Sequence, residues 1–244
     1  MHHVTLERWS RGTSALHRRD PRAKTAALLT FLVVVAMTRS HLLAASVAWL
    51  AWLCLAAAWA RLPLGGVLAR AALVLPFGMV FAAVSWAAGD PEHAGSLLIK
   101  SYLSAAAVLV LAGTTPVPQF LNGLERSGVP RFLLMVVQFL YRYLFVISEE
   151  AQHMRTAARS RGASVGGIVA HRARFRAAGG ALAVLFARSY ARAEEIHRAM
   201  MARGFEGHFQ PLGTFRFVAA DAVFLLVAVP APLVIRLLVE KAVP

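Results

Sequence analysis

Two Glu-x-x-His pairs are the side chains in this sequence whose types and spacing best suit metal chemistry. They are Glu150-Ala151-Gln152-His153 and Glu194-Glu195-Ile196-His197. Residues three apart share one face of a helix, and two such pairs with additional glutamates build di-iron sites in helical bundles. Arg155 and Arg198 flank the pairs, and their charge opposes metal binding. We predict no metal site and keep a di-iron membrane enzyme as the alternative of another class.

A second pattern, a small residue followed by Arg and Gly, occurs twice. The two copies are Ser160-Arg161-Gly162 and Ala202-Arg203-Gly204. Locally the pattern is typical of a helix C-terminus, where Gly adopts a left-handed conformation and Arg complements the helix dipole. Two guanidinium groups at helix ends also suit docking to a soluble partner, because each binds a carboxylate through two hydrogen bonds and stays charged when desolvated.

Signatures of several enzyme classes are missing from the sequence. It contains no GxxxxGK[ST] phosphate loop and no HExxH pair, so we predict neither an ATPase nor a zinc protease. Cys54 is the single cysteine and offers no Cys-based zinc site. His2-His3 suit Cu or Ni, but we interpret them as part of a polar arm. We predict no catalytic residue and no cofactor.

The composition is typical of a membrane protein. Of 244 residues, 58% are hydrophobic and 16% charged, against about 45–50% and about 25% in globular proteins. The net charge of +14 favours nucleic acid as the partner of a soluble protein. Membrane proteins, however, keep basic residues on their cytoplasmic side. We therefore predict an all-α polytopic membrane protein that binds no nucleic acid.

Five apolar stretches approach the roughly 20 residues that a bilayer-crossing helix needs. Four lie in residues 24–114 and one in residues 214–244, with limits near 24–39, 41–60, 70–89, 97–114 and 215–238. Pro76 should kink the third stretch. Residues 1–23 are too polar for a signal peptide, so we expect them to form a basic arm.

The charges of the connecting segments predict the orientation. The arm is basic, whereas Asp90, Glu92 and His93 lie between the third and fourth stretches. Basic segments stay in the cytoplasm. We therefore expect a cytoplasmic N-terminus, an external acidic loop, residues 115–213 in the cytoplasm and a short external C-terminal tail.

Residues 115–213 are predicted to form three helices. Proline and glycine positions place them near 130–161, 168–178 and 181–203, with Gly179-Gly180 separating the last two. The stretch from Phe132 to Ile147 is almost uniformly apolar, which at 16 residues is marginal for a span. It either dips toward the bilayer or packs against another membrane subunit.

Two charges lie in apolar surroundings, where charged residues usually mark function. They are Arg142 in the Phe132–Ile147 stretch and Asp221 in the fifth apolar stretch. For Asp221 we expect an ion pair with the nearby Arg216 at the membrane interface.

Three stretches together resemble a known family, the transmembrane T component (EcfT) of energy-coupling factor (ECF) transporters, and within it the CbiQ subunit of cobalt transporters. The segment from His17 to Lys24 is similar to the family's Asp-Pro-Arg-x-Lys entry to its first helix. Tyr141-Arg142-Tyr143 and the residues after it, through Glu149-Glu150, resemble the cobalt branch. The two Ala-Arg-Gly motifs of the family correspond to Ser160-Arg161-Gly162 and Ala202-Arg203-Gly204.

This resemblance implies a non-catalytic coupling subunit of an importer in the bacterial cytoplasmic (inner) membrane. Arg161 and Arg203 would enter grooves on two ABC ATPase subunits of CbiO type. Tyr141, Arg142 and Tyr143 would contact a substrate-binding membrane subunit of CbiM type, with a small CbiN-type subunit alongside. The implied substrate is cobalt, with nickel or a vitamin as alternatives, and a scaffold protein without transport activity is the remaining alternative.

Overall fold

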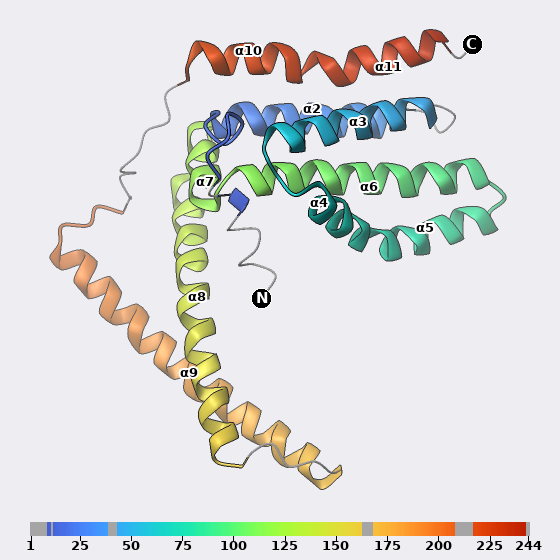
Figure 1. Ribbon diagram of the computed structural model, residues 1–244. Helices are drawn as coiled ribbons and strands as arrows, with labels where there is room; N and C mark the ends of the chain where they lie inside the picture. The colour runs from blue at the N-terminus through green and yellow to red at the C-terminus, as the bar shows by residue number, and fades with distance from the viewer. Residues whose placement is uncertain (1–8, 11, 39–42, 163–167, 208–216, 243–244) are drawn as a thin grey trace. The chain divides into compact units, whose positions relative to one another are not determined.

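The computed structural model describes residues 9–10, 12–38, 43–162, 168–207 and 217–242 (Figure 1). Every regular element from residue 21 onward in these ranges is a helix. The helices are α2 (Pro21–Met37), α3 (Leu43–Trp59), α4 (Leu64–Ala71), the 3₁₀ turn η1 (Ala72–Val74), α5 (Leu75–Ala87), α6 (Pro91–Thr114), α7 (Val117–Arg126), α8 (Arg131–Ser160), α9 (Ile168–Ala202), α10 (Ala219–Ala228) and α11 (Pro230–Ala242).

The chain divides into two compact units. The first holds α2 to α7 together with α10 and α11, and the second, residues 128–212, holds α8 and α9. We call them the bundle and the two-helix unit. Two helices of the bundle start in the same way: Asp20 and Asp90 cap α2 and α6, and each accepts a backbone N–H while a proline follows at the first helical position. Both features favour helix initiation.

The core of the bundle surrounds α6, which packs against α2, α3, α4 and α5. Phe31 and Trp49 meet edge to face at 6.4 Å between ring centroids, and Leu103 of α6 is only 2% exposed. The core also contains small residues that let helix backbones approach closely, namely Ala45, Ala71, Ala106 and Ala107. The indole N–H of Trp49 donates to the carbonyl of Pro232 at 3.3 Å, which ties α3 to α11.

The apolar stretches predicted from the sequence correspond to helices of the bundle. Among the described residues, four helical stretches are long and apolar enough to cross a membrane. Three belong to the bundle, namely Leu64–Ala87, Pro91–Thr114 and Ala219–Lys241. The fourth, Arg131–Ser160, is α8 of the two-helix unit, which we did not count among the five predicted spans. The first two predicted spans are α2 and α3, of 17 residues each. η1 interrupts the third span just before Pro76, where we predicted a kink. The all-α polytopic membrane fold is confirmed.

The division of residues 115–213 differs from our prediction. The helix predicted near 130–161 is α8, but the helices predicted at 168–178 and 181–203 form one continuous helix, α9. The predicted break at Gly179-Gly180 is therefore wrong. A glycine costs about 1 kcal/mol relative to alanine in a helix interior, which the helix-forming residues on both sides offset. The third helix of this segment is instead α7, which packs against α2 in the bundle.

Replacing Gly180 by Ala tests this account of α9. The added methyl group meets no atom within 4 Å, so we expect the free energy of unfolding to rise by up to about 1 kcal/mol. Thermal unfolding in one detergent measures the change. Gly128→Ala is the control with the opposite sign, because Gly128 has a φ of +95° that alanine adopts only with strain. Destabilisation by Gly180→Ala would contradict a continuous helix.

Candidate functional site

The first small-Arg-Gly motif forms the C-terminal cap of α8. Arg161 is the cap residue, and its backbone N–H donates to the carbonyl oxygens of Ala157 and Ala158, each at 3.2 Å. Gly162 follows with a φ of +82° and donates its N–H to the carbonyl of Arg159 at 3.0 Å. The helix therefore ends on a left-handed glycine, as the sequence pattern predicted.

The second motif ends α9 with the same geometry. Gly204 has a φ of +75°, and its N–H donates to the carbonyl of Met201 at 3.1 Å. The N–H of Phe205 donates to the carbonyl of Met200, also at 3.1 Å. These two hydrogen bonds define a Schellman cap, which holds the backbone of Arg203 in one conformation.

Both motif arginines are exposed at the ends of their helices. Within the part of the chain that the structure describes, neither guanidinium belongs to an ion pair. The two helix ends lie at separate ends of the two-helix unit (Figure 1). Each arginine thus extends from a fixed backbone into solvent, where its guanidinium is available to a carboxylate on a partner.

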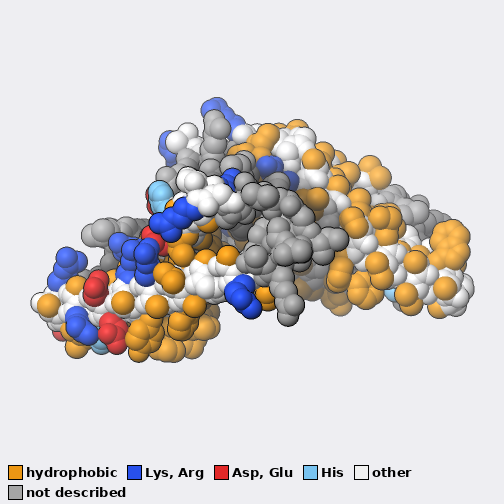
Figure 2. Space-filling model, turned by 90° about the horizontal axis from the view of Figure 1, so that it is seen from below, with side chains coloured by type: hydrophobic (Ala, Val, Ile, Leu, Met, Phe, Trp, Pro, Cys, Tyr) orange, Lys and Arg blue, Asp and Glu red, His pale blue; other side chains and the backbone are white. Residues whose placement is uncertain are grey.

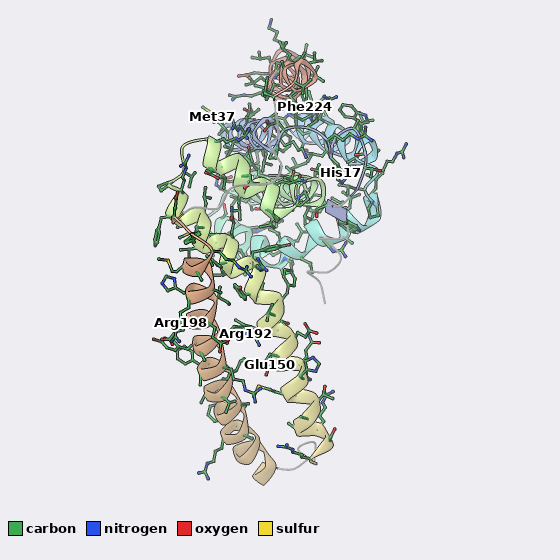
Figure 3. All side chains as sticks on the ribbon, turned by 90° about the vertical axis from the view of Figure 1, so that its left-hand side faces the viewer. His17, Met37, Glu150, Arg192, Arg198 and Phe224 are labelled. Carbon is green, nitrogen blue, oxygen red and sulfur yellow. The ribbon has the colours of Figure 1, made fainter. Side chains whose placement is uncertain are left out.

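The helices α8 and α9 are joined by an ion pair between Glu150 and Arg188. Next to it lies a groove of about 370 Å³, lined by apolar residues of both helices that include Phe139, Ile147, Leu185 and Ile196. In Figure 3, Glu150 and Arg192 lie between the helices, whereas Arg198 lies on the outer side of α9. The apolar face predicted for residues 181–203 therefore faces α8 in part.

Tyr141, Arg142 and Tyr143 lie midway along α8. The ring of Tyr143 stacks on Phe139 at 6.1 Å and lines the groove. Arg142 is exposed, with its guanidinium carbon 5.9 Å from the centroid of the Tyr143 ring. Arg142, a charge within an apolar stretch of the sequence, is therefore not buried within this unit and does not line the groove.

The Glu-x-x-His pairs do not form a metal site in the described residues. No three side chains of His, Cys, Asp or Glu lie close enough there to hold an ion. Glu150 is paired with Arg188, Glu194 with Arg198 at 3.1 Å, and His153 lies 3.7 Å from Glu149. Four carboxylates cannot converge while arginines neutralise two of them. His2-His3 lie outside the described residues.

The surfaces of the two units differ in chemistry. Hydrophobic side chains dominate the visible face of the bundle, whereas Lys, Arg, Asp and Glu gather on the two-helix unit (Figure 2). The two-helix unit nevertheless exposes several large apolar side chains, with Phe132, Phe175, Phe186 and Leu182 each at least 66% exposed. Exposed apolar groups among charges are typical of a surface that contacts other proteins or lipid.

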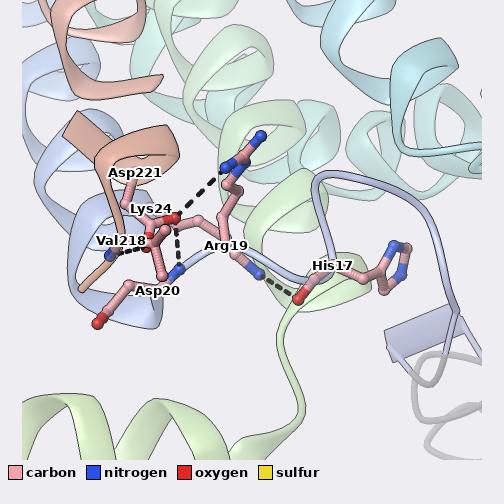
Figure 4. A network of polar contacts seen from close by, with 6 residues as sticks. All are labelled: His17, Arg19, Asp20, Lys24, Val218 and Asp221. Atoms are coloured by element: carbon pink, nitrogen blue, oxygen red, sulfur yellow. Dashed lines mark hydrogen bonds and ion pairs between the residues drawn. The ribbon is translucent and has the colours of Figure 1, made fainter. Parts of the chain in front are cut away.

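A buried lysine closes one end of the bundle. Lys24 of α2 is 5% exposed, and its ammonium donates to the carbonyl of Thr114 at 2.9 Å, to the hydroxyl of Thr115 at 3.1 Å and to the carbonyl of His17 at 3.4 Å. Figure 4 shows the contact with His17. An ammonium has three donors, so all of them are used.

The imidazole of His17 also forms hydrogen bonds with three partners. Its Nδ1 lies 2.7 Å from the hydroxyl of Ser14, and its Nε2 lies 2.9 Å from the carbonyl of Trp9 and 3.2 Å from that of Gly113. Because the two carbonyl groups only accept, Nε2 carries the proton and Nδ1 accepts from the serine. The end of the arm is therefore fastened to the C-terminus of α6.

Asp221 is the second buried charge at this end of the bundle. It is 3% exposed and accepts backbone N–H groups from Asp20 at 3.3 Å and from Val218 at 3.0 Å. Its other partner is the guanidinium of Arg19 at 3.8 Å (Figure 4). The partner expected for Asp221, Arg216, lies outside the described residues, so that ion pair stays a prediction. We did not identify Lys24 as a buried charge from the sequence. The sequence signal that could have identified it is a charged residue within an apolar helix.

Fold and site together define a polytopic helical membrane protein with two arginine-tipped helices outside its bundle. The family model for CbiQ, described as a cobalt transport protein, matches residues 12–212. The chain belongs to this family, and the resemblance carried by its motifs is confirmed.

Three relatives show this similarity at the level of single sequences. The cobalt transport protein CbiQ of Rhodobacter capsulatus is 33% identical over 187 residues, which cover 75% of this chain and 71% of the relative. The energy-coupling factor transporter transmembrane protein EcfT of Acidaminococcus fermentans is 29% identical over 230 residues, which cover 84% of each chain. An uncharacterised protein of Methanocaldococcus jannaschii is 28% identical over 147 residues, 57% of this chain and 53% of that protein.

Replacing Lys24 by Met tests how much its buried hydrogen bonds contribute to the stability of the bundle. Met has a similar length but no donors, so the carbonyl groups of Thr114 and His17 and the hydroxyl of Thr115 lose the donor that Lys24 provides. We expect the free energy of unfolding to fall by about 2 kcal/mol, measured by thermal unfolding in detergent. Lys241→Met, at an exposed lysine in the last turn of α11, should leave stability unchanged. Equal stabilities of the two variants would show that the buried hydrogen bonds contribute nothing.

Proposed function

We propose that this chain is the membrane-embedded coupling subunit of an ECF-type importer and is not itself an enzyme. It passes the motion of two ABC ATPase subunits to a separate substrate-binding membrane subunit. The observation that carries this proposal is the pair of exposed arginines, Arg161 and Arg203, each followed by a left-handed glycine at a helix end and neither in an ion pair among the described residues, in a chain of the CbiQ family.

Ser160, Arg161 and Gly162 form one ATPase-docking site, and Ala202, Arg203 and Gly204 form the other. A capped helix end fixes the backbone of its arginine, so only the side chain has to be ordered when the guanidinium enters a partner groove. Helices of 30 and 35 residues extend about 45 and 52 Å. Because the Glu150–Arg188 ion pair joins them, a displacement at either tip is passed to the other helix.

The contact with the substrate-binding subunit involves the middle of α8. Tyr141, Arg142 and Tyr143 present aromatic rings and one exposed guanidinium there, and tyrosine and arginine are enriched at protein interfaces. The exposed apolar side chains of α8 and α9 extend this surface. A small accessory membrane subunit completes the proposed complex.

Cobalt is the proposed substrate. This rests on the family description and on the relative from Rhodobacter capsulatus, both of which name cobalt transport. Nickel or a vitamin is the alternative, because the EcfT relative carries no substrate in its name. The substrate itself would be bound by the partner subunit.

The bundle is proposed to lie in the bacterial cytoplasmic membrane with the N-terminus inside. The start of α2, which Arg18 and Arg19 precede, and the end of α3, which Arg61 follows, lie at one end of the bundle, and the turn between α5 and α6, which contains Asp90, lies at the opposite end (Figure 1). Basic residues remain on the cytoplasmic side, so this asymmetry supports an internal arm, an external acidic turn and an external C-terminal tail.

Reversing the charge of both arginines tests the docking sites. Arg161→Glu with Arg203→Glu should abolish co-purification of the ATPase subunits and ATP-dependent uptake of radiolabelled cobalt. Each introduced glutamate repels the partner carboxylate that the arginine is proposed to bind. Single substitutions should retain part of the binding, since the two sites act together. Membrane insertion should be unchanged.

The matched control is Arg155→Glu with Arg176→Glu. Both residues are exposed on α8 and α9, and the net charge changes equally. This control should keep the ATPase subunits and transport. Normal co-purification by the Arg161/Arg203 variant, or equal loss in the control, would remove the assigned docking role.

Labelling with a membrane-impermeant maleimide tests the orientation. With Cys54 replaced by Ser, Glu92→Cys should react in intact spheroplasts, and Ala15→Cys should react only after permeabilisation. Both positions are exposed in the bundle, so accessibility depends on the side of the membrane alone. The reverse pattern would place the arm outside.

A further inference from the structure

The bundle contains a groove that neither the docking sites nor the proposed transport accounts for. It has a volume of about 470 Å³ and runs along α2, α3, α6 and α10. Its floor includes Leu28, Phe31 and Val110, and its rim includes Trp59 and Phe224. Apart from residues at one end, its lining is apolar. Figure 3 labels Phe224, on the helix that forms one side.

The length of the groove matches half of a bilayer. Its lining extends from Lys24 to Phe31 along α2 and from Ala220 to Pro232 along α10 and α11, about 10 and 18 Å at 1.5 Å per residue. Half of the hydrocarbon core is about 15 Å thick. The groove therefore spans one leaflet, on the side of the membrane where α2 begins.

A guanidinium lies at the end of the groove, at the depth of the lipid headgroups. Lys24 also lines this end, but its three donors are already used. Arg19 is different: its side chain is 23% exposed, and its ion pair with Asp221, at 3.8 Å, is too long for a hydrogen bond. Its Nε is buried and finds no acceptor among the described residues.

We propose that this groove is a binding site for one anionic phospholipid. The headgroup phosphate accepts hydrogen bonds from Arg19, and an acyl chain lies against Leu28, Phe31 and Val110. Arginine suits a phosphate because its planar fork donates two parallel hydrogen bonds. Arg61, exposed in the segment after α3, adds positive potential near the headgroup, whereas Arg18 does not line the groove. Bound lipid also bridges α3 and α10, which the groove separates.

The site is independent of ATPase docking, because all of its residues belong to the bundle. It also differs from general attraction of anionic lipid by a basic surface. Such attraction depends on the number of cations and not on which arginine is present or on the shape of an apolar groove. One experiment separates the two explanations.

Native mass spectrometry of the full chain in mild detergent measures the binding. Phosphatidylglycerol and phosphatidylcholine with identical acyl chains are added in equal amounts. We expect one tightly retained phosphatidylglycerol molecule, preferred about tenfold. Both headgroups carry a phosphate, but the choline ammonium of phosphatidylcholine offsets the negative charge that attracts the guanidinium of Arg19. Inorganic phosphate in excess should not displace it, because the acyl chain contributes to binding.

Two pairs of variants locate the site. Arg19→Gln removes the charge at the groove, and Arg18→Gln removes an equal charge from the exposed neighbour. Ala27→Phe fills the groove, because Ala27 lines it, and Ala26→Phe adds the same ring at an exposed position of α2. Arg19→Gln should lose the preference for phosphatidylglycerol and Ala27→Phe should lose retention of either lipid, while both neighbouring variants behave as the unaltered chain does.

Three results would overturn the proposal. Equal retention of the two lipids by the unaltered chain would exclude an anionic headgroup site without reference to any variant. Equal effects of Arg18→Gln and Arg19→Gln would leave only general attraction to the basic surface. Complete displacement by inorganic phosphate would reduce the site to an anion site without a lipid tail.

Discussion

The buried ammonium of Lys24 is the interaction on which one end of the bundle depends. The last turn of α6 ends among apolar neighbours, where its carbonyl groups are without water and need donors. Lys24 reaches the carbonyl of Thr114, 90 residues further along the chain, and the carbonyl of His17 in the arm. One side chain thus joins the arm, α2 and the end of α6. Asp221 adds α10 through the backbone of Asp20.

The two units handle polar groups in different ways. In the bundle, Lys24 and Asp221 at the closed end are buried and hydrogen-bonded, as a hydrocarbon environment requires. In the two-helix unit, charges are numerous and exposed, and the ion pairs of Glu194 and Glu149 lie on the surface, where such pairs contribute little to stability. The buried polar groups of the bundle therefore stabilise its fold, whereas the exposed surface of α8 and α9 is suited to contacts with other molecules.

The two small-Arg-Gly motifs combine a structural role, ending their helices, with the docking role that we propose for them. Glycine ends the helix because it adopts a positive φ, and the arginine before it then points from a fixed backbone into solvent. Removing either residue would disturb both roles. A docking site of this kind requires no pocket on this chain, which is consistent with a groove supplied by the partner.

Local features of the structure were predictable from the sequence, and partnerships over long distances were not. The apolar stretches, the start of α2 at Asp20-Pro21 and the caps at Gly162 and Gly204 depend on neighbouring residues alone, and composition and spacing reveal such features. The motif resemblance also identified the family. The continuity of α9 through Gly179-Gly180 was not predictable, because propensity is a weak guide against neighbouring helix formers.

Only the tertiary structure decided which charges meet. Asp221 accepts the N–H of Asp20 from 201 residues away, and no spacing rule connects them. The exposure of Arg142 and the lipid-sized groove beside Arg19 follow from how the helices pack together. Sequence determines the helices and their ends because those depend on local hydrogen bonds. Packing determines partners and cavities because it brings together residues that the chain keeps apart.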